Sequence, residues 1–166
     1  MATALFVNTD DLVKFTSLNG NIDVDNFIQW VKVAQDIHIQ NYLGTDLFNK
    51  INDGIVNDDL AAPYTTLLNT YIKPMVIHWA MVVYIPQAPY TFSEKGVFKH
   101  SSENATVIDL DEIDRLVTNA TDIAQHYTRR FIDYICYNSN SFPEYNSNSN
   151  GDVYPEKESD FGGWML

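Results

Sequence analysis

The stretch MVIHWAMVVYI, residues 75–85, is the longest apolar run in the chain and decides the fold. Pro74 and Pro86 bound it, and its 11 residues fall well short of the roughly 20 that a membrane-spanning helix needs. A helix that is apolar on every face has to be covered on every side, by its own domain or by another subunit. The sequence therefore predicts that residues 75–85 form the central helix of a small helical protein.

The residues before this run predict two further helices separated by a glycine. Apolar side chains between Phe27 and Tyr42 recur at intervals of three and four residues, and Gly44 ends the pattern. Thr45 has the side chain of a helix cap, so we expect it to start a brief helix that Gly54 closes.

The residues after the central run predict a β-hairpin and then a long helix. At about residues 87–101, two short aromatic or β-branched runs flank a four-residue loop that ends in Gly96. Asp109 and Glu112 then match a capping box, and apolar residues from Ile113 to Ile135 form one broad helical stripe. The expected fold class is mainly α: a small helical bundle of residues 1–137 with one β-hairpin and an extended C-terminal arm.

Residues 138–166 differ in composition from the rest of the chain. These 29 residues contain five Asn, five Ser, five acidic residues and one Lys, which is too little apolar area to offset the loss of backbone entropy. We therefore expect a flexible polar arm that ends in a hydrophobic anchor, FGGWML. Because its aromatic and apolar side chains have no core to join, we predict that they bind another chain. These residues are Phe142, Tyr145, Tyr154, Phe161, Trp164, Met165 and Leu166.

The composition and motifs argue against nucleic-acid binding and against catalysis. With 22 acidic and 10 basic residues, the net charge is −12, so the surface should repel phosphates. The sequence lacks the motifs of zinc proteases, phosphate loops, serine hydrolases and paired Cys/His metal sites. His78 interrupts the apolar run and is expected to be a hydrogen-bonded core residue. We therefore predict a protein that is not an enzyme and has no catalytic residues, metal or cofactor.

The order of these motifs resembles the head-to-tail connector proteins of tailed bacteriophages, and most closely the neck ring proteins of crAss-like phages. The likeness covers about residues 7–137. It is carried by AQDIHIQNYLGTDLFNKI (34–51), YTTLLNTYIKPMVIHWAMVVYIP (64–86), KGVFKHSSENA (95–105) and AQHYTRRFIDYI (124–135). The most telling piece is the first, in which a Leu-Gly break separates an AQ-containing helix from a second short helix.

The resemblance implies a structural virion protein, made in the host bacterial cytoplasm and located in the neck below the portal vertex. Such proteins form homo-oligomeric rings, usually twelvefold, that contact the portal protein and adjacent neck or tail proteins. Genome DNA passes through the lumen without specific binding, and no membrane is involved. The hairpin residues expected to contact partners are Tyr90, Phe92, Val97 and Phe98.

One alternative remains open from the sequence. The chain could be a non-viral soluble adaptor module whose hydrophobic C-terminus binds a groove on a partner, a known mode of peptide recognition.

Overall fold

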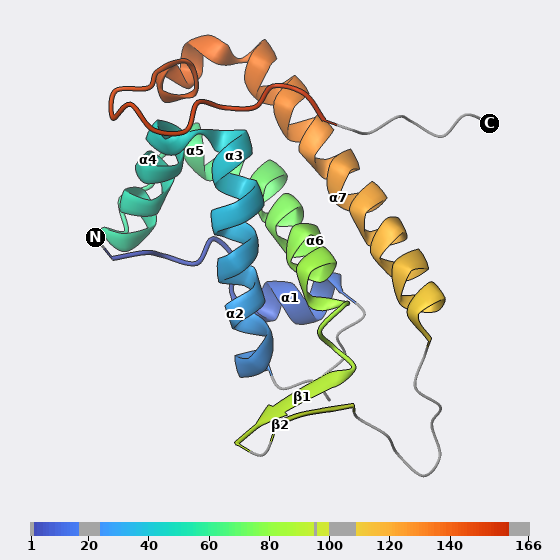
Figure 1. Cartoon of the computed structure of the whole chain (residues 1–166). Coiled ribbons are helices and arrows are strands. Elements are labelled where there is room, and N and C mark those ends of the chain that lie inside the picture. Colours follow the sequence, from blue (N-terminus) through green and yellow to red (C-terminus); the bar gives the residue numbers. More distant parts are fainter. Residues whose placement is uncertain (1, 17–23, 95, 100–108, 160–166) are drawn as a thin grey trace, which may run out of the picture.

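Three helices form the centre of the protein in the computed structural model, which describes residues 2–16, 24–94, 96–99 and 109–159 (Figure 1). They are α2 (Val24–Ala34), α6 (Lys73–Tyr84) and α7 (Leu110–Tyr137). Helix α6 lies between the other two and contacts both. The expectation of a small, mainly α-helical bundle is confirmed.

Helix α6 supplies the middle of the core because it is apolar on nearly every face. Its buried side chains are Met75, Val76, Ile77, Trp79 and Ala80. The indole N–H of Trp79 donates to Thr128 Oγ1 of α7 at 3.0 Å, which satisfies the polar atom of this side chain inside the core. The prediction of a central helix is therefore confirmed.

The remaining helices are short. They are α1 (Thr9–Phe15), α3 (Gln40–Leu43), α4 (Thr45–Val56) and α5 (Tyr64–Leu67), with 3₁₀ turns at Ser139–Ser141 and Pro143–Asn146. Two π-helical turns, Gln35–Ile39 and Leu68–Ile72, connect α2 to α3 and α5 to α6. The chain is therefore helical without a break through residues 24–43 and again through residues 64–84.

The helix after Gly44 differs from the expectation in its start and its end. Gly44, at φ +73°, occupies the capping position, and Thr45 is the first helical residue instead of the cap. Helix α4 also continues through Gly54 to Val56. Gly54 does not end the helix but allows close packing, because a Cβ at this position would lie 2.5 Å from Leu60 Cδ1. The missing side chain lets the returning chain approach the helix closely.

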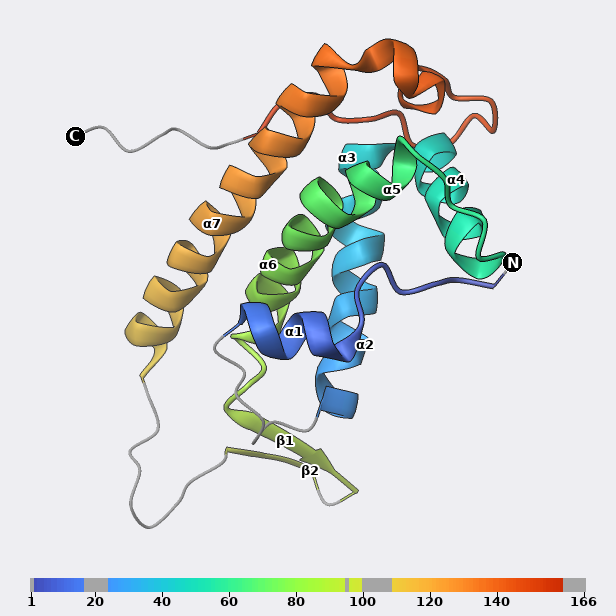
Figure 2. The ribbon, with the colours of Figure 1, turned by 180° about the vertical axis from the view of Figure 1, so that it is seen from behind.

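The β-hairpin consists of β1 (Tyr90–Ser93) and β2 (Gly96–Lys99). The strands are antiparallel, with Tyr90 opposite Lys99 and Ser93 opposite Gly96. The hairpin lies at the end of the bundle opposite α4 and α5 in both ribbon views (Figures 1 and 2). This confirms the hairpin that the sequence predicts at about residues 87–101 and defines the bounds of its two strands.

Helix α7 begins with the capping box that the sequence predicts. The backbone N–H of Glu112 donates to Asp109 Oδ1 at 2.9 Å, and the backbone N–H of Asp109 donates to Glu112 Oε2 at 3.3 Å. Two backbone donors without helical partners are thereby satisfied, which fixes where this helix begins.

The C-terminal arm is packed on the bundle as far as Ser159, so the expectation that it is flexible is wrong for residues 138–159. Phe142 and Tyr145 are both 0% exposed and belong to the core. The Phe142 ring meets Tyr64 edge-on at 5.4 Å between centroids, and Tyr145 meets Phe131 in the same way at 6.0 Å. Two aromatic side chains therefore bring the arm into the core, although most of its residues are polar.

The polar residues of the arm bind the N-terminal end of α4. Asp46 accepts hydrogen bonds from Ser147 Oγ at 2.6 Å and from both the N–H and the Oγ of Ser149, each at 2.8 Å. The backbone N–H of Thr45 donates to the carbonyl of Val153 at 2.9 Å. These hydrogen bonds lower the pKa of Asp46, with Ser147 contributing most. The Asn and Ser residues thus supply hydrogen bonds to the bundle, which their composition alone does not reveal.

Replacing Thr128 by Val should reduce the free energy of unfolding by about 1–3 kcal/mol, because the shape is kept but the buried Trp79 indole loses its acceptor. Thr121→Val is the matched control: the Thr121 hydroxyl donates to the Val117 carbonyl at 2.8 Å and satisfies no other buried side chain. Urea unfolding of both variants measures the difference. Equal losses would show that the indole hydrogen bond does not stabilise the core.

Candidate functional site

Clusters of metal-binding side chains do not occur in the described part of the chain. No three His, Cys, Asp or Glu residues among them come close enough together to hold a metal ion. None of the described helices is both long and apolar enough to cross a membrane. The sites described next are the aromatic histidine contacts, the predicted partner surfaces and one groove.

Two histidines stack on aromatic rings of the bundle. His38 lies parallel to Trp79 at 3.9 Å between centroids, and His78 lies parallel to Tyr127 at 4.8 Å. His78 is partly exposed on the surface of α6, so the expectation of a core histidine is wrong. Burial lowers the pKa of both imidazoles below the ordinary value of 6.5, because it disfavours their charged form.

The stability of the fold should fall when the pH drops below about 6.5. His38 and His78 have lowered pKa values in the folded state, so the unfolded chain binds protons more readily. Their contribution is therefore complete above the unfolded pKa and is lost as the pH falls through it. Thermal unfolding at about pH 7.5 and pH 5.5 measures this, and His38→Gln and His78→Gln should each reduce the pH dependence.

The exposed His126, on α7, provides the control for the pH experiment, as His126→Gln. A pH dependence that is the same in the His38 and His78 variants as in the unchanged chain would contradict the prediction.

The predicted hairpin contacts are exposed where their side chains are described. Tyr90 is 39% exposed and Val97 is 59% exposed, and the strand register places both on one face of the hairpin. The side chains of Phe92 and Phe98 lie outside the described part. The prediction that these four residues contact a partner is retained.

The predicted anchors of the arm fall into three groups. Phe142 and Tyr145 are core residues, so the structure contradicts their assignment as partner contacts. Tyr154 is half-exposed and stays a candidate. The anchor residues Phe161, Trp164, Met165 and Leu166 lie outside the described residues.

A second apolar surface runs along α7, and two of its residues, Leu116 and Ile123, belong to the stripe that the sequence predicts for this helix. Leu116 and Ile123 are 46% and 45% exposed, and Tyr137 is 91% exposed. Together with Arg130 they recur every seven residues, which places them along one side of a helix, and we call them the α7 stripe.

A groove of about 490 Å³ lies between α1, α6 and α7. Phe15, Pro74 and Tyr127 supply apolar surface, and Lys73 and Arg130 supply basic groups. The carboxylate of Asp11 and the imidazole of His78 also line the groove. Figure 2 shows α1 in front of α6 on this side, with α7 diverging from α6 toward its N-terminal end. No sequence motif predicts this groove, because it needs three elements that are distant in the chain.

The basic groups of the groove are held by neighbouring side chains. Lys73 Nζ lies 3.1 Å from Asp11 Oδ2, and the Arg130 guanidinium lies over the Tyr71 ring at 5.6 Å from its centroid. Both arrangements fix a cation while leaving it partly exposed to solvent. The groove therefore combines apolar and positively charged surface in a chain whose net charge is −12.

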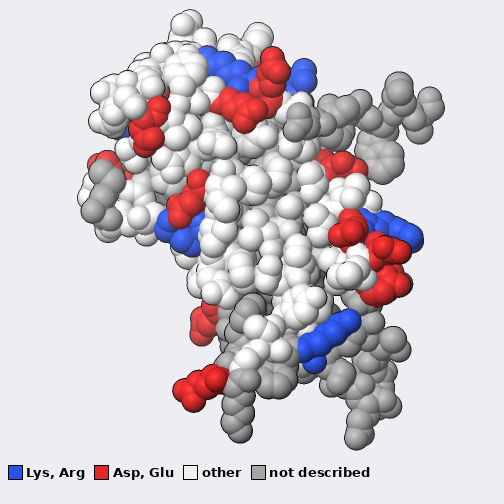
Figure 3. Space-filling view, in the orientation of Figure 1, with Lys and Arg blue, Asp and Glu red and all other residues white. Residues whose placement is uncertain are grey.

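The described residues of the opposite face carry charges of both signs (Figure 3). Figure 3 shows acidic and basic groups scattered around its edge, with a largely uncharged band down its middle. Lys32 and Asp36 form one mixed pair through an i,i+4 ion pair on the surface. A surface of mixed sign without a basic patch offers little to a phosphate backbone.

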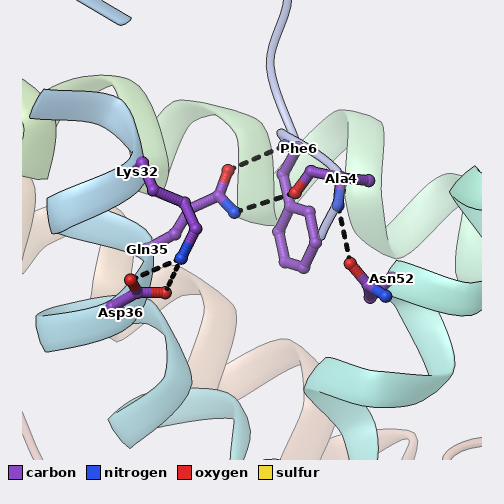
Figure 4. Close-up of polar contacts among 6 residues, drawn as sticks. All are labelled: Ala4, Phe6, Lys32, Gln35, Asp36 and Asn52. Carbon is purple, nitrogen blue, oxygen red and sulfur yellow. Dashed lines mark hydrogen bonds and ion pairs between the residues drawn. The ribbon is translucent and has the colours of Figure 1, made fainter. Parts of the chain in front are cut away.

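The AQ motif of residues 34–35 positions the N-terminal segment through the side chain of Gln35. Figure 4 shows the buried Gln35 reaching this segment: its Oε1 accepts from the Phe6 N–H at 2.7 Å, and its Nε2 donates to the Ala4 carbonyl at 3.2 Å. The Ala4 N–H in turn donates to Asn52 Oδ1 at 2.8 Å. A buried side chain thus joins the N-terminal segment to the bundle.

Comparison with known proteins gives a family but no activity. Residues 39–155 match the model of a family of unknown function, DUF6712. The match includes the hairpin and most of the packed C-terminal arm. No curated protein and no solved structure matches the chain.

Proposed function

The chain belongs to the DUF6712 family, whose function is unknown, and we propose that it is a structural virion protein of a tailed bacteriophage. In this proposal it forms a homo-oligomeric ring, a dodecamer by the resemblance of its motifs, in the virion neck between portal and tail. The ring extends the DNA channel. The role is structural, without catalysis or a cofactor.

The distribution of exposed apolar side chains carries the proposal. They lie on several elements, which include the hairpin at one end of the bundle, the α7 stripe, and α1, where Phe15 is 63% exposed; Ile37, Val56, Leu110 and Tyr154 are exposed as well. A ring subunit needs two different surfaces that meet each other in successive copies, together with a further surface for the next ring. Separate apolar patches on different elements can provide these surfaces, whereas a single ligand site would concentrate the apolar side chains in one place.

The charge of the chain supports the proposed channel. A net charge of −12 gives a surface that makes few attractive phosphate contacts, so DNA could move through a ring of such subunits without being held. The hairpin, which exposes Tyr90 and Val97 away from the core, is the element proposed to contact the portal or an adjacent neck protein.

Co-expression with the portal protein from the same genome tests the proposal. Electron microscopy of the purified material should show a symmetric ring of this chain attached to the portal. Replacing both exposed hairpin residues, Tyr90→Ala and Val97→Ala, should reduce recovery of the complex, whereas Val56→Ala on α4 should not. A chain that never co-purifies with portal, neck or tail proteins would contradict the function, and binding to an unrelated partner would favour the soluble adaptor module instead.

A further inference from the structure

We propose that the groove between α1, α6 and α7 binds residues 158–166, ESDFGGWML, from a second copy of the chain. The inference rests on the ring-forming part of the proposed function and names the contact by which neighbouring copies associate. The occupant is the same chain, and the contact is head-to-tail: the C-terminal segment of one copy meets the groove of the next.

The chemistry of the groove matches that of the segment. The groove presents an apolar surface from Phe15, Pro74 and Tyr127 beside the cation of Arg130 and that of Lys73, which is paired with Asp11 in the same lining. The segment carries two acids, Glu158 and Asp160, followed by four large apolar residues. They are Phe161, Trp164, Met165 and Leu166. An acidic stretch followed by aromatic anchors is complementary to an apolar groove with a basic rim.

The groove is also of a suitable size. Its volume of about 490 Å³ falls within the roughly 300–1,000 Å³ of sites that enclose most of a small ligand. A single large aromatic side chain with a neighbouring apolar residue fits this range. Trp164 is the natural anchor, because aromatic residues bury the most area for the fewest rotatable bonds.

The geometry favours a second copy over the same copy. Residues 152–159 cross α7 on the side that faces the viewer in Figure 1, whereas α1 lies behind α2 and α6 in that view and in front of them in Figure 2. The Glu156 N–H donates to the Asn41 carbonyl at 2.9 Å, which fixes residue 156 beside α3. Donor and acceptor surfaces on opposite sides of a subunit give a heterologous contact, which closes into a ring when the rotation allows it.

Repetition explains how a modest contact could hold a ring. Ordering the segment costs conformational entropy that offsets much of what its burial contributes, so one contact is weak. After the first contacts form, the remaining ones act within a single assembly, where the effective concentration of each segment is high. The unassembled chain can therefore remain monomeric at low concentration and associate cooperatively on a portal.

Two complementary variants of the full chain test the inference by sedimentation velocity. Phe15→Glu damages the groove at an exposed position, and Trp164→Ala damages the segment. Each variant alone should self-associate at least ~10-fold more weakly than the unchanged chain, because truncation of an aromatic anchor has effects of this size. A mixture of the two should form a one-to-one dimer, because one intact groove then meets one intact segment.

A matched control and a charge exchange establish that the effects arise in the groove itself. Val56→Glu places the same charge on an apolar residue of α4 with 48% exposure, outside the groove, and should leave association unchanged. Arg130→Glu should weaken association, and adding Glu158→Arg should restore part of it. Circular dichroism of each variant verifies that it is folded.

Two results of the sedimentation experiment would overturn the inference. In the first, Phe15→Glu or Trp164→Ala self-associates as strongly as the unchanged chain. In the second, a mixture of the two variants stays monomeric. If the unchanged chain is monomeric, a labelled peptide of residues 156–166 must bind the Trp164→Ala chain with saturable anisotropy and must bind Phe15→Glu more weakly. Its failure to bind would also overturn the inference. If Phe15→Glu forms rings on the portal as readily as the unchanged chain, the groove contact is contradicted and the proposed function is not. If the peptide binds the groove but no rings form on the portal, the proposed function is contradicted and the groove contact is not.

Discussion

Truncation after Asn138 should leave a chain that is largely unfolded or has lost most of its stability, whereas truncation after Ser159 should have little effect. The first deletion removes Phe142 and Tyr145, which are both 0% exposed. Removing one large aromatic side chain from a core costs about 3–5 kcal/mol, and a whole domain is stable by only about 5–15 kcal/mol. The loss of both side chains therefore removes a large share of the total.

The same deletion also exposes the groups that the arm covers. Tyr64 and Phe131 lose their edge-on aromatic partners, and Asp46 loses the hydrogen bonds from Ser147 and Ser149. The second deletion, after Ser159, removes none of these contacts. The two truncations thus separate the packed arm from the segment beyond it.

Urea unfolding followed by circular dichroism compares the two truncated chains with the unchanged chain. Phe142→Ala provides a milder version of the first deletion and should cost about 3–5 kcal/mol by itself. A truncation after Asn138 that unfolds at the same urea concentration as the unchanged chain would show that the arm does not belong to the core.

Replacing Gly44 by Ala should cost several kcal/mol, because this position combines backbone strain with a close contact. Gly44 has φ +73° and ψ 159°, a conformation that residues with a side chain occupy at a cost of about 1–3 kcal/mol. An added Cβ would also lie 2.6 Å from both Cδ and Cγ of Pro155. Such overpacking of a well-packed site typically costs about 1–3 kcal/mol more.

Two further variants separate the strain from the close contact. Gly151 has φ +63° and nothing within 4 Å of an added Cβ, so Gly151→Ala should show the backbone cost alone, roughly 1–2 kcal/mol. Pro155→Ala should make Gly44→Ala less costly, because it removes the ring that the new Cβ would meet. Urea unfolding of this double-mutant cycle is the measurement, and equal losses for Gly44→Ala and Gly151→Ala would contradict the proposed contact.

The parts of the fold that the sequence predicts are those encoded by neighbouring residues. An all-apolar run identified α6, the loop before Gly96 indicated the hairpin, and the Asp109–Glu112 capping box fixed the start of α7. Each of these signals lies within a few turns of the chain, where propensity and spacing act directly.

The packed arm could not be predicted from composition, because its stabilisation comes from contacts about one hundred residues apart in sequence. A composition rich in Asn and Ser is typical of disordered segments. Ser147 and Ser149 instead bind Asp46 on α4, and this partner cannot be identified without the fold. Phe142 and Tyr145 stand out as aromatic residues in a polar segment, but they bind the core of their own chain and not a partner.

The groove and the α7 stripe escaped prediction for a related reason. Helix α7 diverges from α6 toward its N-terminal end, which leaves Leu116 and Ile123 exposed although their spacing suits a buried face (Figure 2). The groove arises where this divergence meets α1. The angle at which two helices cross depends on all the residues at their contact. The periodicity within one helix therefore does not predict this angle.

The mass of the complex with the portal protein tests the central claim most directly. Native mass spectrometry of the co-expressed and purified complex should give one discrete species in which the copies of this chain form a complete ring on the portal. The unchanged chain and Val56→Glu should give the same number of copies in each ring, and the Trp164→Ala chain should give incomplete rings. A portal that carries no copies of the chain, or a variable number without a preferred complete set, would contradict the claim that this protein is a ring-forming adaptor.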